Sequence, residues 1–180
     1  MKRTVSFEAI KALREKTSAS LNDVRVALEA SLGDEAKALE LLRRRGAQIA
    51  EQREGRATGQ GRVESYVHHD GRLGVLVEVN CETDFVARTP EFTQFCRDVA
   101  MHVAAMNPRH VRKEELPPHA AQDAEALKVS CLLEQPFVKD QGTTINGLLE
   151  GLIATTGERV VIRRFIRFAV GDAATAPPSA

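Results

Sequence analysis

The stretch RVESYVHHDGRLGVLVEV, residues 62–79, decides the fold of this 180-residue chain. Apolar and polar residues alternate along it on both sides of Asp70-Gly71, a dipeptide that strongly favours a turn between two antiparallel strands. The odd-numbered residues of 73–79 are all Leu or Val, so one face of the return strand is apolar throughout. The stretch therefore predicts a β-hairpin with one buried face.

Downstream of the hairpin, helical and strand patterns alternate up to residue 170. Thr89 can cap a helix with Pro90 at its first position, and Gly157 can end a second helix that Thr143 or Thr144 caps. The expected order is a helix from Pro90, a loop over 107–124, a short helix over 124–133, the helix ending before Gly157, a strand over 159–170 and a disordered tail over 171–180.

Upstream of the hairpin, residues 6–45 predict three short helices with apolar stripes. Ser20 and Asp34 can cap the second and third helices, and Gly46 follows the third helix as its C′ residue. The residues expected to face inward are Phe7, Ile10, Leu13, Leu21, Val24, Leu28, Leu39 and Leu42. We therefore expect an α+β chain, with a three-helix domain over 1–46, a helical or flexible linker over 47–61, and an α+β core domain with an antiparallel sheet over 62–170.

The composition of the chain excludes several classes of function. Lys plus Arg and Asp plus Glu both number 25, and aromatic residues make up 4% with no Trp, so neither a general nucleic-acid surface nor a base-stacking surface is expected. No apolar run has the length of a signal peptide or of a membrane span. Three cysteines, an odd number at wide spacing, fit a reducing compartment. We expect a cytoplasmic protein without a nucleic-acid or membrane partner.

The sequence lacks the common catalytic and metal-binding motifs. It has no phosphate-binding loop, no nucleophile elbow, no zincin motif and no Cys-x-x-Cys pair. His68 and His69 are expected in a strand, where neighbouring side chains point to opposite faces and cannot share a metal. Cys81 and His102 could meet as a thiol–imidazole pair, but inert thiols are the favoured interpretation. We expect no enzymatic activity, no metal and no cofactor.

Two groups of arginines have open interpretations. The run Arg43–Arg45 either contacts RNA or, as we favour, places positive charge in the last turn of a helix. Arg159, Arg163 and Arg167 are expected on one face of the last strand, where they either line an interaction surface or solvate an outer face.

The most informative segment is NCETDFVAR, residues 80–88, which joins the return strand to the helix after Thr89. It places a carboxylate, an aromatic ring and a branched aliphatic side chain next to each other at Asp84, Phe85 and Val86. Phe85 either packs under the sheet as part of the core, which the residues alone favour, or stays exposed as an anchor that fills a partner's pocket.

The run VEVNCETDFVAR at residues 77–88 resembles the signature of the elongation factor Ts family. The runs LLEQPFVKD at residues 132–140 and IRRF at residues 162–165, and the opening helices between Leu13 and Gly46, resemble further parts of that family in the same order. The resemblance implies an N-terminal ubiquitin-associated-like domain of three helices, followed by a dimerisation-type core domain.

A member of this family is expected to be a translation elongation factor that binds GDP-bound elongation factor Tu (EF-Tu) and promotes GDP release. By resemblance, Thr83, Asp84, Phe85 and Val86 insert near the Mg²⁺ and phosphate site of EF-Tu and disturb it. The resemblance also implies that the helical domain contacts the same nucleotide domain, and that the sheet contacts a separate domain of EF-Tu. Further candidate contacts are Asn80, Cys81, Arg14 and Asp23.

The chain departs from the family pattern in its middle, where only a short segment separates Pro118 from Leu132. This leaves no room for a second core subdomain or a coiled-coil insertion. The turn Ser20-Leu21-Asn22-Asp23 also replaces a commoner Gly-Met-Met-Asp-like run. Because short members can act as dimers, a homodimer is a further expectation. The shortened middle leaves an alternative function, a paralogue that stabilises or inhibits EF-Tu without catalysing exchange.

Overall fold

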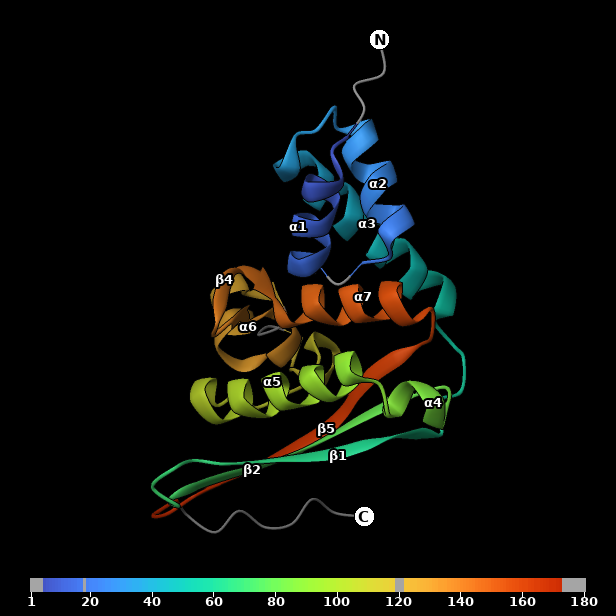
Figure 1. The fold of residues 1–180 in the computed structure, drawn as a ribbon. Helices are drawn as coiled ribbons and strands as arrows, with labels where there is room; N and C mark the ends of the chain where they lie inside the picture. The colour runs from blue at the N-terminus through green and yellow to red at the C-terminus, as the bar shows by residue number, and fades with distance from the viewer. Residues whose placement is uncertain (1–4, 18, 119–121, 173–180) are drawn as a thin grey trace.

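The computed structural model describes residues 5–17, 19–118 and 122–172 (Figure 1). The described elements, in chain order, are α1 (Phe7–Thr17), α2 (Leu21–Ala30), α3 (Glu35–Arg53), β1 (Gln60–Val67), β2 (Leu73–Cys81), α4 (Asp84–Ala87), α5 (Pro90–Met106), η1 (Lys113–Glu115), α6 (Ala124–Ser130), η3 (Leu132–Glu134), β3 (Pro136–Phe137), β4 (Asp140–Thr144), α7 (Ile145–Thr156) and β5 (Val160–Ala169). The predicted α+β class, with helices ahead of an antiparallel sheet, is confirmed.

Helices α1–α3 share a small apolar core. Ser20 and Asp34 cap α2 and α3 as predicted, because their side chains accept hydrogen bonds from backbone N–H groups in the first turns. Phe7 and Leu21, predicted to face inward, are instead 71% and 48% exposed. Each is the first residue of its helix, where a side chain leans toward the N-terminus and away from the packed turns. The buried residues of this core are Ile10, Leu13, Ala19, Val24, Ala27, Leu28 and Ala38.

Helix α3 does not end before Gly46, and this prediction was wrong. The helix continues to Arg53, and Gly46 keeps a negative φ and is buried against α7. A Cβ atom at position 46 would lie 3.1 Å from the backbone oxygen of Glu150, so the glycine serves the close approach of two helices. Of the linker predicted over 47–61, residues 47–53 are thus helical, and Ile49 and Ala50 pack against the second core. The domain boundaries stay a prediction.

The predicted hairpin is confirmed as the centre of the second core. Strand β2 lies between β1 and β5, and both pairs are antiparallel. The inward residues Val75, Val77, Val79 and Cys81 are all at most 3% exposed. Helix α5 covers this face of the sheet, and α7 lies beyond α5, with α1–α3 at the top of the view (Figure 1).

The turn of the hairpin is longer than the sequence indicated. His68 N donates to the Leu73 carbonyl, and Gly71 adopts a φ of 69°, so the chain reverses over residues 68–72. His68 and His69 therefore lie beyond the strand, and their ring centroids are 4.3 Å apart. The prediction that the two rings point to opposite faces was wrong. In the described ranges, no group of three or more His, Cys, Asp and Glu residues is placed to hold a metal ion.

The second half of the core is built largely as predicted. Thr89 and Thr144 cap α5 and α7 through their hydroxyl groups, and Gly157 ends α7 with a φ of 70°. The short hairpin of β3 and β4 was not predicted, because its second strand is a polar run without alternation. The predicted helix over 124–133 ends at Ser130. Of the predicted disordered tail, residues 173–180 lie outside the described residues. Among the helices that the structure describes, none is long and apolar enough to cross a membrane.

Candidate functional site

The candidate segment begins where β2 leaves the sheet. Cys81 is the last inward residue of β2, and its Sγ donates to the Thr83 carbonyl at 3.1 Å. Burial raises the pKa of this thiol to about 11, so it stays protonated and unreactive at neutral pH. Asn80 is half-buried on the opposite face, where its Nδ2 donates to Glu78 Oε1 at 3.2 Å. Both side chains therefore support the strand end.

Helix α4 is a single turn that presents Phe85 to solvent. Thr83 is its N-cap, and the Thr83 hydroxyl accepts a hydrogen bond from Val86 N at 3.4 Å. Val86 and Ala87 face the core and are 5% and 8% exposed, whereas Phe85 is 78% exposed. The core alternative for Phe85 is therefore wrong, because the two buried residues of the turn direct the ring outward.

Asp84 lies next to the exposed ring, in the first turn of α4. Its carboxylate forms an ion pair with Arg88 at 2.8 Å, and both side chains are mostly exposed. An ion pair of this kind contributes little to stability. Asp84 and Phe85 thus place one exposed carboxylate and one exposed aromatic ring side by side on a short turn, which Val86 and Ala87 anchor to the core.

The residue that holds Thr83 in place was not predicted from the sequence. Glu158, from the turn between α7 and β5, accepts hydrogen bonds from Thr83 N at 3.0 Å and from Thr83 Oγ1 at 2.7 Å. The adjacent Glu82 accepts a hydrogen bond from Arg159 N at 2.7 Å. Because 75 residues separate Thr83 from Glu158, no local pattern could have revealed the contact.

Arg14 and Asp23 lie in the helical part of the molecule, away from α4 (Figure 1). Arg14 is exposed on α1. Asp23 is less available, because it pairs with Arg45 at 2.9 Å and accepts a hydrogen bond from Ser20 Oγ. The structure therefore brings Thr83–Val86 together and leaves these two candidates on a separate surface.

The arginine run 43–45 lies in the middle of α3, not in its last turn. Arg43 donates to the Gly142 carbonyl at 3.0 Å, Arg44 pairs with Glu40, and Arg45 pairs with Asp23. Each guanidinium thus has a partner within the chain. Because α3 continues to Arg53, the run lies far from the helix C-terminus, and the expected interaction with that terminus was wrong.

The last strand does not keep its three arginines on one face. A bulge shifts the register between Glu78 and Val79, so Glu78 pairs with Arg164 while Val79 pairs with Ile162. The extra residue, Arg163, reverses the alternation of the side chains beyond it. Arg167 consequently reaches the Ala104 carbonyl on α5, and the prediction of a shared face was wrong.

Cys81 and His102 do not form a thiol–imidazole pair. His102 is fully buried, its Nε2 lies 3.0 Å from Gln135 Oε1, and its Nδ1 accepts a hydrogen bond from Val138 N at 3.2 Å. Burial lowers the pKa of His102, so the ring is neutral at neutral pH. These hydrogen bonds of His102 join α5 to the segment before β4, and neither partner is a nucleophile.

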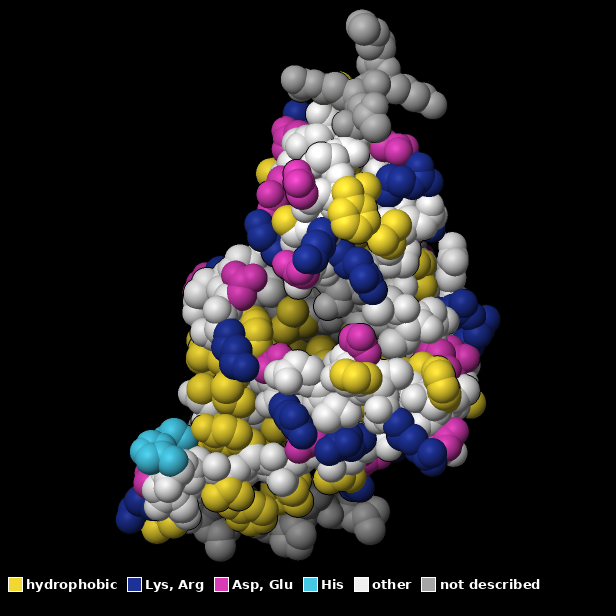
Figure 2. All heavy atoms as spheres, viewed as in Figure 1, with side chains coloured by type: hydrophobic (Ala, Val, Ile, Leu, Met, Phe, Trp, Pro, Cys, Tyr) yellow, Lys and Arg dark blue, Asp and Glu magenta, His cyan; other side chains and the backbone are white. Residues whose placement is uncertain are grey.

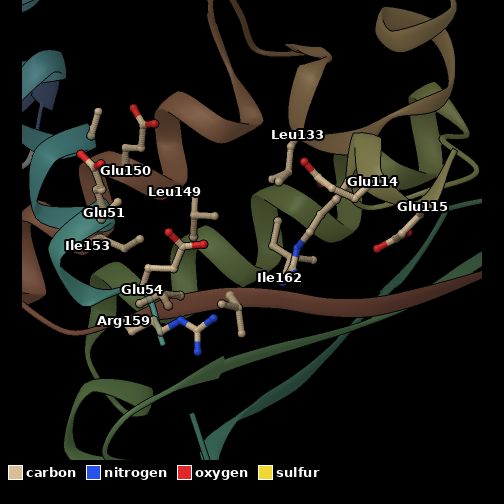
Figure 3. Close-up of a pocket in the computed structure, with 15 residues that line it drawn as sticks. Glu51, Glu54, Glu114, Glu115, Leu133, Leu149, Glu150, Ile153, Arg159 and Ile162 are labelled. Atoms are coloured by element: carbon tan, nitrogen blue, oxygen red, sulfur yellow. The ribbon is translucent and has the colours of Figure 1, made fainter. Parts of the chain in front are cut away.

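A cleft of about 630 Å³ opens between α3, α7 and the segment around η1 (Figure 3). Its floor includes Leu149, Ile153 and Ile162, and carboxylates stand on both sides, as Figure 3 shows. Burial raises the pKa of Glu150, which accepts a hydrogen bond from Asn146. The acidic residues of the cleft are Glu51, Glu54, Glu114, Glu115 and Glu150. It is separate from α4 and contains no arrangement that suggests catalysis.

The described residues thus form a helical part (α1–α3) and an α+β core, with an exposed aromatic side chain on a short turn between a strand and a helix of that core. The family model for elongation factor Ts matches residues 3–129. The elongation factor Ts of Rubrobacter xylanophilus is 46% identical over 189 aligned residues, covering 90% of this chain and 97% of the relative. Those of Carboxydothermus hydrogenoformans and Thermotoga neapolitana are 42% and 41% identical, covering 93% of this chain and 90% and 98% of their own lengths.

The chain belongs to the elongation factor Ts family, and it is a translation elongation factor. This membership supports the main functional interpretation over the paralogue that does not catalyse exchange. The 189 positions aligned with the Rubrobacter protein span 90% of a 180-residue chain, so that relative has residues inside the alignment that this chain lacks.

Proposed function

We propose that this protein promotes the release of GDP from EF-Tu through the segment Thr83–Val86. The observation that supports the proposal is the exposure of Phe85, which is 78% exposed although Val86 and Ala87, the next two residues of the same turn, are buried. A large exposed ring on a rigid support binds at a low cost in conformational entropy, which is typical of an interface anchor. Asp84 brings a carboxylate to the same place.

The mechanism needs no covalent chemistry from this protein. GDP and Mg²⁺ are held in EF-Tu by a preorganised phosphate-binding loop and by the charge of the ion. A ring that inserts beside that loop displaces its backbone, and the carboxylate of Asp84 competes with the phosphates for the ion. Nucleotide binding becomes weaker, and by thermodynamic linkage the nucleotide weakens binding of this protein by the same factor. Incoming GTP can then release the factor.

The helical module gives the second contact in this proposal. Arg14 and Asp23 lie on α1 and α2, on a surface that α4 does not share. Two separate contacts on one partner raise the affinity for it, because the second forms at a high effective concentration. The charge balance, with 25 cationic and 25 anionic residues, favours a protein partner over nucleic acid or a membrane. The site of action we propose is the cytoplasm.

A second copy of the chain is the proposed partner for the outer face of the sheet, in place of the separate EF-Tu domain that the resemblance implies for the sheet. This apolar sheet face consists of Val63, Val67, Leu76, Ile166 and Phe168, which are 38% to 67% exposed. Residues Val67, Gly74 and Phe168 are direct neighbours across the three strands, as are Ser65, Leu76 and Ile166. Figure 2 shows hydrophobic side chains gathered along the lower side of the molecule, over the sheet. Packing of two such faces buries apolar surface that a monomer leaves in water.

Two experiments test these proposals. Release of a fluorescent GDP analogue from EF-Tu should become faster with this protein present; an unchanged rate with retained binding would instead support the non-exchanging paralogue. Sedimentation should show a dimer that Leu76→Glu dissociates, with Val129→Glu on α6 as the exposed control. A monomeric wild type whose Leu76→Glu variant loses affinity for EF-Tu would assign the apolar sheet face to EF-Tu.

A further inference from the structure

The loop that carries the candidate segment is tied to a second loop by an exchange of carboxylate–amide hydrogen bonds. Glu158 accepts from Thr83 N at 3.0 Å, and Glu82 accepts from Arg159 N at 2.7 Å. Each loop thus provides a carboxylate for a backbone N–H of the other loop. The two loops leave neighbouring strands, because Cys81 and Val160 are the last paired residues of β2 and β5 at this end of the sheet.

A second hydrogen bond makes this contact specific for the start of α4. Thr83 Oγ1 donates its proton to Glu158 Oε1 at 2.7 Å and accepts from Val86 N at 3.4 Å. A hydroxyl group that donates to Glu158 keeps its lone pairs free for the helix, so Glu158 favours the capping rotamer of Thr83. A hydrogen bond to an ionised carboxylate is stronger than a neutral one.

A third segment is joined to the same network. Arg56, between α3 and β1, pairs with Glu82 Oε2 at 3.1 Å, and its carbonyl accepts a hydrogen bond from the Arg159 guanidinium. The Arg159 amide and the Arg56 guanidinium hold the pKa of Glu82 below its ordinary value, so Glu82 is ionised at neutral pH. The loop after β2 is therefore attached on two sides before α4 begins.

A single helical turn has little stability of its own. Val86 and Ala87 fix the inner side of α4 by burial, but burial does not by itself fix the beginning of the turn. The contact of Glu158 with Thr83 fixes the beginning of the turn, and Asp84 and Phe85 follow directly after Thr83 in the chain. Ordering these two residues before they meet a partner reduces the entropy lost on binding.

We propose that Glu158 is a positioning residue for nucleotide exchange, which holds Thr83 so that α4 presents Phe85 and Asp84 in the orientation that EF-Tu binds. The proposal rests on the proposed function of the segment Thr83–Val86. It assigns to Glu158 an effect on exchange that acts through Phe85, although Glu158 itself comes from a different loop.

The test is a double-mutant cycle, read as the efficiency of fluorescent GDP release from EF-Tu. Glu158→Ala should lower the efficiency about tenfold, the loss of one strong hydrogen-bonded contact. Glu158→Gln keeps one acceptor oxygen and should recover part of the loss. Glu158→Ala combined with Phe85→Ala should lose less than the product of the two single losses, because the ring that Glu158 positions is gone and only Asp84 is left to position. Glu125→Ala, an exposed carboxylate on α6, is the matched control and should exchange like wild type.

Several results would overturn the proposal. Losses that multiply in the double variant would show that Glu158 acts independently of Phe85. If both Glu158 variants melt below the assay temperature, Glu158 is required for the stability of the fold, and its effect on exchange does not come from positioning α4. Wild-type exchange by Glu158→Ala, with exchange lost in Phe85→Ala, would overturn the role of Glu158 alone. Wild-type exchange by Phe85→Ala would overturn the proposed function as well.

Discussion

Replacement of Phe85 by alanine separates the role of this residue in binding from its role in the fold. The side chain is 78% exposed. Full burial of an aromatic side chain removes roughly 150–250 Å² from water, so a partner could still cover roughly 120–200 Å². At about 25 cal/mol per Å², this corresponds to about 3–5 kcal/mol of binding free energy. Since the Cβ atom remains in the variant, we expect a loss of about 2–4 kcal/mol, which is at least about thirtyfold in exchange efficiency.

The same arithmetic predicts a small effect on the fold. The part of Phe85 that the chain already covers is roughly 30–55 Å², or about 1 kcal/mol. For a protein of this size, a loss of about 1 kcal/mol lowers the melting temperature by about 2–4 °C. Asp84→Ala should change melting even less, because its ion pair with Arg88 is exposed.

The assay pairs thermal melting of each variant with its rate of GDP release from EF-Tu. Val129→Ala, an exposed apolar residue on α6, is the control for loss of an exposed side chain and should behave as wild type in both measurements. A melting temperature lowered by more than about 10 °C in Phe85→Ala, with normal release per folded molecule, would refute the reasoning.

Three further predictions follow from other parts of the structure. Gly46→Val should lower the stability by about 1–3 kcal/mol in urea denaturation, because its side chain would separate α3 from α7 at Glu150; unchanged stability would contradict the close approach. Calorimetry should give a weaker affinity for GDP-bound than for nucleotide-free EF-Tu, and equal affinities would exclude exchange. Because burial lowers the pKa of His102 below 6.5, the unfolded chain takes up a proton first as the pH falls. Stability should therefore be full above pH 6.5 and fall below it, and His102→Gln should show a smaller loss between pH 7.5 and 5.5; an equal loss would assign the dependence to other groups.

Much of the fold could be predicted because its signals are local. Thr89 with Pro90, Thr144 and Gly157 mark helix ends through hydrogen bonds and φ angles that involve only a few neighbouring residues. The alternation in β2 predicted the buried face correctly, since a period of two leaves no other arrangement for the valines. The family resemblance, carried by contiguous runs, likewise came from the sequence.

Gly46 shows where local signals fail. A glycine after three arginines is typical of a helix end, yet the backbone there stays helical and the residue is buried against α7. The alternative depends on contact with Glu150 of α7, about a hundred residues further along the chain, so no window around Gly46 contains the information. The bulge at Arg163 is a similar case, because it exists only in the pairing with β2.

The sequence by itself determined the candidate segment Thr83–Val86, the alternating strands and the caps that bound the core helices. It did not determine whether Phe85 faces the core or the solvent, and the residues alone favoured the core. Tertiary structure decided this, because β1, β2 and α5 bury Val86 and Ala87 and leave only the outer side of the turn to Phe85. It also brought Glu158 to Thr83 across 75 residues, a contact that exists only when β2 and β5 pair. The side chains of the candidate site thus come from one short segment of sequence, whereas the direction in which they point depends on packing between segments far apart in the chain.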